Sequence, residues 1–293
     1  MKKIYLLVAV AIIGWSTLTP VTALLVADLP NMQVLFIVSA IAFVSALLLN
    51  CKRENWQILR NYKLKDIVAQ AGLGFLGLFL YTTLYNFGLT QLSAQDANII
   101  NYLWPLMIIL FSIPILREKL TFRKILAATL SFIGLIVIVT RGDISSFQPE
   151  SIAGIAACFG AAVCFGLFSV LNKKANYNQF VAIVIFFATT MIFSGIAFAV
   201  GGNFAPLTLA QFGGLAWLGI MSNAVAYLAW GIALRRGDTA KISNSAYIIP
   251  FLTVILSALM LGENIYIYSI IGLLLIVGGI LIQNLKLKKS PHI

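Results

Sequence analysis

The stretch that decides the fold is AQDANIINYLWPLMIILFSIPILRE, residues 94–118, together with TAKISNSAYIIPFLTVILSALMLGE, residues 239–263. The two stretches align without a gap at a spacing of 145 residues, the separation of Pro105 from Pro250. Each has a tyrosine shortly before the proline and a glutamate at its far end: Tyr102 and Glu118, then Tyr247 and Glu263. Each is apolar for about 20 residues, the length that crosses a bilayer as a helix. The pair therefore predicts two related membrane helices.

The amino-acid composition indicates that the rest of the chain also consists of membrane helices. Of its 293 residues 61% are hydrophobic and only 10% are charged, which is too few to cover a surface that faces water. Apolar runs follow one another with short polar joints, so we expect an all-α integral membrane protein with no separate soluble domain. The predicted spans are residues 4–26, 33–50, 67–89, 94–116, 124–140, 151–172, 179–200, 208–234, 240–261 and 266–285.

The basic residues predict how these ten helices are oriented. Every Lys and Arg except Arg141 lies before the first span, after the last, or in or directly beside a joint that follows an even-numbered span. Cytoplasmic loops are enriched in Lys and Arg. We therefore expect both termini in the cytoplasm, the C-terminal one with Lys286, Lys288 and Lys289, and a multi-pass protein of the bacterial inner membrane.

The repeat divides the chain into residues 1–145 and 146–293, each with five helices. Because five is odd, the second half enters the membrane from the opposite side, which places Glu118 in the cytoplasm and Glu263 outside. Ile13-Gly14-Trp15-Ser16 falls near Val163-Cys164-Phe165-Gly166 at a slightly different offset. A signal peptide ending near Val21-Thr22-Ala23 is an alternative for the first span. Inverted repeats are the common architecture of secondary transporters, whose substrate site lies between the halves.

Polar and aromatic residues inside the spans indicate where that site lies, because a helix facing lipid needs none of them. The third, fourth, eighth and ninth spans hold most: Tyr81 and Tyr85; Asn98, Asn101, Tyr102, Trp104 and Pro105; Asn223, Tyr227 and Trp230; Ser243, Asn244, Tyr247 and Pro250. Helical spacing would let these four sets of residues line a single cavity together. The simpler alternative is that they pack helices together or form interfacial belts. Each proline is expected to kink its helix and free a backbone carbonyl.

Missing residue types exclude several kinds of chemistry. No Lys, Arg, Asp, Glu or His falls near the centre of a predicted span, so neither an embedded proton relay nor a phosphate site is expected. The one histidine is His292 in the tail, and Cys51, Cys158 and Cys164 form no metal or disulfide pattern. We therefore expect no metal, no cofactor and no enzymatic activity.

The pentapeptide Asn101-Tyr102-Leu103-Trp104-Pro105 resembles the signature of YddG-type aromatic amino acid exporters, within the EamA type of the drug/metabolite transporter superfamily. Similar short matches are Trp15-Ser16-Thr17, Asn172-Lys173-Lys174-Ala175, Ala226-Tyr227-Leu228-Ala229-Trp230 and Tyr247-Ile248-Ile249-Pro250. The resemblance implies a bacterial exporter of amino acids. It also implies that parts of the first and sixth helices join the site, which adds Trp15.

We therefore predict an exporter of aromatic or other neutral amino acids that works by alternating access, with Tyr85 and Trp230 in opposite gates. A carrier of another small metabolite or of an amphiphilic cation is the alternative, and a lipid-modifying membrane enzyme is a third possibility. The expected partners are a small-molecule substrate and membrane lipid, with no nucleic acid, and the chain is expected to act as a monomer.

Overall fold

The computed structural model describes residues 2–26, 28–50, 52–201 and 203–284, and within them it is helical with no strand. Nine helical segments are long and apolar enough to cross a membrane, and the tenth, Ile267–Gln283, is slightly shorter. Cys51, His292 and the three C-terminal lysines lie outside the described residues. The nine are Lys2–Val26, Asn31–Leu49, Leu64–Gln91, Ala94–Leu116, Phe122–Val139, Ile152–Ala175, Gln179–Gly201, Leu209–Arg236 and Thr239–Leu261. These bounds lie within a few residues of the predicted ones.

Several of these spans consist of more than one helical segment. The first is α1 (Lys2–Ser16), α2 (Leu18–Val21) and η1 (Thr22–Val26), and the third is α5 (Leu64–Gly74), η2 (Phe75–Leu80) and α6 (Tyr81–Gln91). The eighth is α12 (Leu209–Trp217), η4 (Leu218–Val225) and α13 (Ala226–Arg236). The unbroken spans are α3 (Asn31–Leu49), α9 (Phe122–Val139), α10 (Ile152–Ala175), α11 (Gln179–Gly201) and α16 (Ile267–Asn284).

The fourth and ninth spans break at the predicted prolines. The fourth stops as α7 at Ala94–Asn101 and resumes as α8 at Trp104–Leu116, and the ninth stops as α14 at Thr239–Ser245 and resumes as α15 at Ile248–Leu261. A proline has no N–H for the carbonyl four residues before it. The expectation of a free carbonyl is nevertheless wrong at Pro250. The carbonyl of Ala246 accepts a hydrogen bond of 3.0 Å from the N–H of Ile249 instead, because the chain tightens there into a shorter turn.

The third and eighth spans share a second irregularity. Their middle segments, η2 and η4, are wound as π-helix, and the first lies almost at the 145-residue spacing from the second. A π-helical turn widens the helix and leaves backbone groups less regularly paired, and such turns are frequent at functional sites. Both halves of the chain thus share two irregularities, one span broken at a proline and one widened span, and the first span adds a further π-helical segment, η1.

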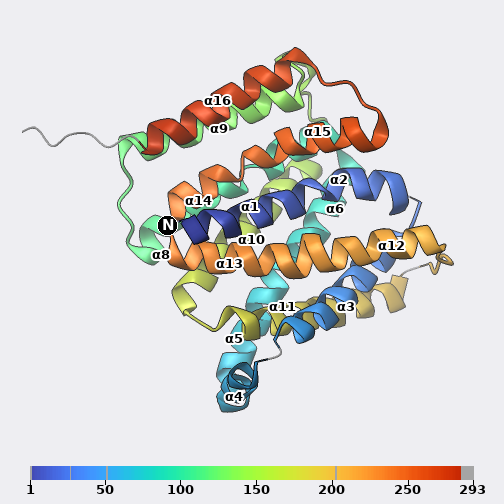
Figure 1. Ribbon diagram of the computed structural model, residues 1–293. Coiled ribbons are helices and arrows are strands. Elements are labelled where there is room, and N and C mark those ends of the chain that lie inside the picture. Colours follow the sequence, from blue (N-terminus) through green and yellow to red (C-terminus); the bar gives the residue numbers. More distant parts are fainter. Residues whose placement is uncertain (1, 27, 51, 202, 285–293) are drawn as a thin grey trace, which may run out of the picture.

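The helices α9 and α16 show how the two halves are related. They lie side by side along one edge of the bundle (Figure 1). A Cβ atom on Gly134 would lie 2.6 Å from the carbonyl oxygen of Gly272, and one on Gly279 would lie 2.6 Å from that of Ala127, so the helices are antiparallel. The Ser131 hydroxyl lies 3.4 Å from the carbonyl oxygen of Ile276, its own counterpart 145 residues on. Counterparts meet each other only at a two-fold axis.

A second pair of contacts obeys the same relation. A Cβ atom on Gly74 of α5 would collide with the backbone of Phe186 in α11, and one on Gly219 of η4 would collide with Ile41 of α3. Gly219 and Phe186 are the counterparts of Gly74 and Ile41 at the 145-residue spacing. The packing is therefore consistent with two inverted five-helix repeats.

The polar joints gather at two ends of the bundle. Asn178 donates to Asn55 at 3.1 Å, and Lys124 pairs with Asp238 at 3.0 Å, so the joints rich in Lys and Arg lie together. We call this the basic end. At the other end Gln33 donates to the carbonyl of Ala205 at 2.7 Å. The joints therefore alternate between the ends as the positive-inside pattern predicts.

One helix outside the spans was not predicted. The segment α4 (Arg53–Asn61) projects from the basic end between the second and third spans (Figure 1). It is too short and too polar to cross a membrane, and Asn55 ties it to the joint that precedes α11.

Candidate functional site

Six aromatic rings meet in the middle of the bundle, and we call them the central aromatic cluster. Trp15 lies at its centre, with ring centroids between 5.3 and 6.1 Å from four of the others. The pairs are mostly edge-to-face, an arrangement that stabilises each pair by about 0.5–1.5 kcal/mol beyond burial. The members come from five spans: Trp15, Tyr81, Trp104, Phe165, Tyr227 and Trp230.

The irregular helices place these rings. Trp104 is the first residue of α8, directly after the break in the fourth span, and Tyr81 is the first residue of α6, directly after the π-helical turn of the third. Tyr227 follows the π-helical turn of the eighth span in the same way. The backbone irregularities and the rings therefore belong to one local structure at the crossing of the two halves.

A ladder of polar side chains leads from this cluster toward the end opposite the basic one. Tyr85 donates from its hydroxyl to the Asn98 side-chain oxygen at 2.8 Å, and the Asn101 amide nitrogen lies 3.3 Å from the Tyr81 hydroxyl. The rings of Tyr81 and Tyr85 are stacked at 6.4 Å. All but Asn101 are half-buried, and the buried Asn101 side-chain oxygen has no hydrogen-bond partner in the described structure. That oxygen is an acceptor that a ligand can use.

The ninth span brings its predicted residues to a different place. Asn244 donates to Gln283 of α16 at 3.2 Å, and the Tyr247 ring packs against Phe132 of α9 and Ile276 of α16. Tyr102 packs against this group and against the larger hydrophobic core that contains the central aromatic cluster. The residues predicted to line a single cavity thus lie in two neighbouring groups, one at the central aromatic cluster and one at the α9–α16 pair. The Ser243 and Tyr247 hydroxyl groups there are buried without a described partner.

The remaining predicted residues make contacts within or beside their own helices. Asn223 donates to the carbonyl of Leu218 at 2.9 Å within its own π-helical turn. Pro105 and Pro250 are buried beside the breaks that they cause. These three shape the backbone around the site.

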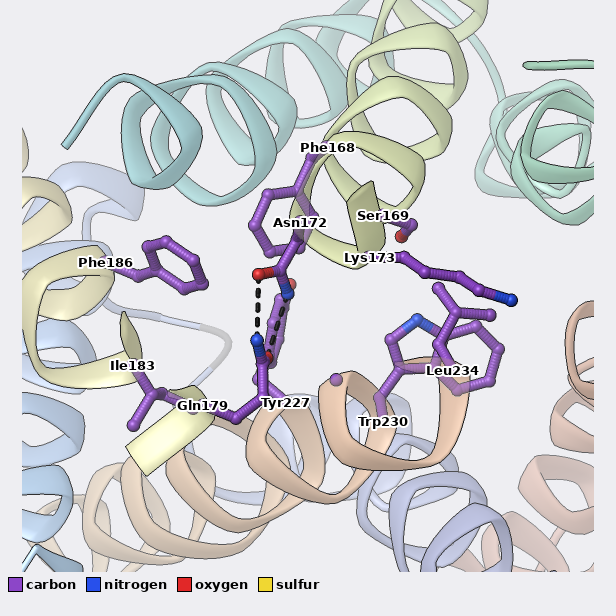
Figure 2. A pocket seen from close by; sticks show the side chains of 11 residues that line it. Phe168, Ser169, Asn172, Lys173, Gln179, Ile183, Phe186, Tyr227, Trp230 and Leu234 are labelled. Atoms are coloured by element: carbon purple, nitrogen blue, oxygen red, sulfur yellow. Dashed lines mark hydrogen bonds between the residues drawn. The ribbon is translucent and has the colours of Figure 1, made fainter. Parts of the chain in front are cut away.

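Sequence reasoning missed residues that complete the site on its basic side. Phe165 belongs to the central aromatic cluster, and Asn172 and Gln179 exchange two amide hydrogen bonds of 3.0 Å between α10 and α11 (Figure 2). Two signals pointed to them: Phe165 aligns with Trp15 in the repeat, and Asn172 and Lys173 stand in one of the short motifs. No sequence pattern indicated Gln179, because it meets Asn172 only through the turn that joins α10 to α11.

Two spaces lie along the basic side. The first is a void of about 10 Å³ beside Trp230 and Ser169, room for about one water molecule. Both the Trp230 indole N–H and the Ser169 hydroxyl are buried without a described partner. The second is an open vestibule of about 630 Å³ at the basic end, lined by Leu116, Glu118, Lys173, Asn176, Asn178, Gln179, Phe180, Ile232, Arg235 and Arg236.

Charges are confined to the ends of the spans, and several are paired there. Lys173 pairs with Glu118 at 2.9 Å and Lys124 with Asp238 at 3.0 Å. Partial burial acts to raise the pKa of Asp238, but the backbone N–H of Lys241 and the ammonium group of Lys124 outweigh it and hold the pKa below its ordinary value. Among the described residues the only charged side chain classed as buried is Asp96, near the start of α7. The central aromatic cluster itself is uncharged.

Broken membrane helices around an uncharged aromatic site, with the charges at the ends of the spans, are typical of membrane transporters. The model of the EamA-like transporter family matches residues 2–140 and 152–285, and the chain belongs to this family.

The similar proteins fit this class. The chain is 26% identical to an uncharacterised transporter, YyaM, of Bacillus subtilis, over 74% of this chain and 73% of that protein. It is 24% identical to a probable terminal-alkyne amino-acid exporter of Streptantibioticus cattleyicolor, over 77% of this chain and 76% of that one. It is 26% identical to the aromatic amino acid exporter YddG of Ancylobacter novellus, over 62% and 64%. A crystal structure with 23% identity superposes with a TM-score of 0.84 over 97% of both chains, which establishes the same fold.

Proposed function

We propose that this transporter exports aromatic and other neutral amino acids, and that the central aromatic cluster with Asn101 binds them. The observation that carries the proposal is the position of the free Asn101 side-chain oxygen next to the Tyr81 hydroxyl, at the edge of an uncharged group of aromatic rings. One is an acceptor and the other a donor.

A zwitterionic amino acid needs this set of groups. Its ammonium group requires acceptors, its carboxylate requires donors, and its side chain requires an apolar surface. The Asn101 oxygen suits the ammonium group, the neighbouring Tyr81 hydroxyl suits the carboxylate, and the rings of Trp15 and Tyr227 suit an aromatic or thioether side chain. A phosphorylated substrate would require buried Arg or Lys, which the site does not offer.

Two of the similar transporters support the substrate class, because one is named as an exporter of an amino acid with a terminal alkyne and the other as an exporter of aromatic amino acids. Both share less than a third of their residues with this chain, so the support is for amino acids as a class.

Alternating access is the proposed mechanism, with the basic end in the cytoplasm of a bacterial inner membrane and one chain as the working unit. On the basic side, Lys173 and Gln179 lie between the open vestibule and the small void beside Trp230, whose side chain is 1% exposed. This arrangement supports a state in which the basic end is closed between the vestibule and the cluster. Trp230 would then belong to the closed gate and Tyr85 to the open one.

Transport by the purified protein in sealed liposomes tests the substrate. Labelled phenylalanine, tryptophan and methionine should cross and be recovered chemically unchanged, while a sugar phosphate should not. Protein-free liposomes and a Trp104→Ala variant are the controls. Transport of sugar phosphate without any amino acid would refute the proposal.

An amphiphilic cation is the second candidate, because aromatic rings bind ammonium groups through cation–π contacts and the site holds no cation that would repel one. Phenethylamine separates the two candidates, since it is phenylalanine without the carboxylate. An amino acid exporter should prefer phenylalanine, and a cation carrier should prefer phenethylamine.

A further inference from the structure

The passage between the vestibule and the central aromatic cluster is closed by polar side chains. The vestibule and the small void beside Trp230 share two lining residues, Lys173 and Gln179. These residues therefore separate a space open to water from the site. The hydrogen bonds that Lys173 and Gln179 make therefore determine whether the basic end is open or closed.

Lys173 ties together four of the spans at this end. Its ammonium group donates to the Glu118 carboxylate at 2.9 Å, to the carbonyl of Gly237 at 3.0 Å and to the Thr239 hydroxyl at 2.6 Å. Lys173 belongs to α10, Glu118 follows α8, Gly237 directly follows α13 and Thr239 begins α14. The Thr239 hydroxyl in turn donates to Glu118. An ammonium group has three hydrogens, and here each has an acceptor.

The Asn172–Gln179 pair completes the closure next to it. Gly231 of α13 lies against the pair, and a Cβ atom at that position would lie 2.2 Å from the Gln179 side-chain oxygen. The two amides thus seal α10 and α11 against α13. Figure 2 shows the amides facing each other while the Lys173 side chain extends away from them.

We propose that Lys173 is the gating residue of the basic end, and that its ammonium group must leave Glu118, Gly237 and Thr239 before substrate can pass between the vestibule and the central aromatic cluster. This inference rests on the proposed alternating access. The Lys173 and Glu118 side chains are 16% and 24% exposed, so both border the vestibule and can be hydrated when they separate. A polar latch of this kind opens reversibly, because water replaces the hydrogen bonds that are lost.

Side-specific cysteine labelling tests the gate without a substrate. The reporter is Ser169→Cys, which lies beside the void, in a background where Cys51, Cys158 and Cys164 are replaced by alanine. A charged methanethiosulfonate reagent is applied from one side of sealed vesicles at a time. Lys173→Gln should speed labelling from the basic end by on the order of tenfold, because removing an interaction of the closed state shifts the equilibrium toward the open one.

Matched variants distinguish a gate from a loss of stability. Lys174→Gln removes the neighbouring exposed lysine and should leave the labelling rate unchanged. Glu118→Gln should act like Lys173→Gln, whereas Lys173→Arg, which keeps a cation with several donors, should stay closer to the rate of the parent. Thermal unfolding of each variant is measured alongside, and Glu118→Gln replaces Lys173→Gln if the latter does not fold.

Two results would overturn the proposed gate. One is an unchanged labelling rate in both Lys173→Gln and Glu118→Gln. The other is labelling that becomes equally faster from both sides of the membrane, which indicates that the whole helix bundle has loosened. The labelling result does not depend on which molecule is transported. If no amino acid crosses in liposomes while Lys173→Gln still opens the basic end, then the substrate proposal fails and the gate stands.

Discussion

The side chain of Trp15 connects several spans of the protein. Its ring contacts those of Trp104, Phe165, Tyr227 and Trp230, which come from the fourth, sixth and eighth spans. It therefore joins the first repeat to the second at the proposed substrate site. Removing the ring affects both the packing of the site and the surface offered to a substrate.

Trp15→Ala should lower aromatic amino acid transport by at least about tenfold and should destabilise the protein by about 3–5 kcal/mol, because a large buried ring is replaced by a cavity. Trp15→Phe keeps an aromatic face and should retain most of the activity. Initial transport rates in liposomes and thermal unfolding of the same preparations measure both effects. Equal losses in the two variants would mean that the indole, rather than an aromatic surface, is required.

Asn101→Ala and Tyr227→Leu should separate recognition of the amino acid backbone from recognition of its side chain. Asn101 offers its free oxygen to groups that every amino acid shares, so Asn101→Ala should raise KM for all substrates by roughly tenfold, a loss typical of one hydrogen bond to a charged group. Tyr227→Leu should change the preference between tryptophan and methionine. An Asn101→Ala protein with parent kinetics would rule out this assignment.

At the scale of elements, the α9–α16 pair forms the axis about which the two halves are related. Its backbones approach closely at Gly134, Gly272 and Gly279, which leave no room for a Cβ atom. Small residues allow this approach, and dispersion contacts between the backbones stabilise helix pairs in lipid. The pair is therefore expected to act as a rigid support for the ninth span, which rests on it through Asn244 and Tyr247.

Gly272→Ala should destabilise the protein by about 1–3 kcal/mol, because the added Cβ atom would lie 2.4–2.5 Å from Ile138 and from the carbonyl of Gly134. Gly278→Ala is the matched control on the same helix, since a Cβ atom there meets only Leu130 at 3.7 Å. Thermal unfolding in detergent compares the two. Similar midpoints for both variants would show that the close approach does not contribute to stability.

At the scale of the whole molecule, the inverted relation of the halves predicts how the chain is threaded through the membrane. The joint after the fourth span lies at the basic end, where Glu118 pairs with Lys173, whereas its counterpart after the ninth span lies at the opposite end. Equivalent loops of the two repeats should therefore face different compartments.

Single cysteines at Lys119 and Asn264, in the cysteine-free background, should be labelled from opposite sides of the membrane. Both joints lie outside the spans and Asn264 is exposed, so a membrane-impermeant reagent can reach them. Labelling of Lys119→Cys from the cytoplasmic side is expected from the positive-inside rule. If both cysteines react from the same side, the inverted threading is wrong.

The sequence by itself determined the positions of the spans, the 145-residue repeat and the interruption of two spans at prolines. These follow from local properties, because a helix in lipid must be apolar over a set length and a proline interrupts it wherever it lies. The sequence also determined several residues of the central aromatic cluster, namely Trp15, Tyr81, Trp104, Tyr227 and Trp230, because aromatic residues in mid-span are unusual.

Only the tertiary structure decided which polar residues share a site. Asn244 and Tyr247, whose counterparts in the first repeat are Ile99 and Tyr102, lie against α9 and α16, and the helical spacing alone does not give this contact. The Asn172–Gln179 pair and the hydrogen bonds of Lys173 to Glu118 and Thr239 also follow only from the tertiary structure, since each joins residues from different helices. Sequence spacing reports which residues share one helix face; the neighbour opposite that face follows only from the packing of all the helices together.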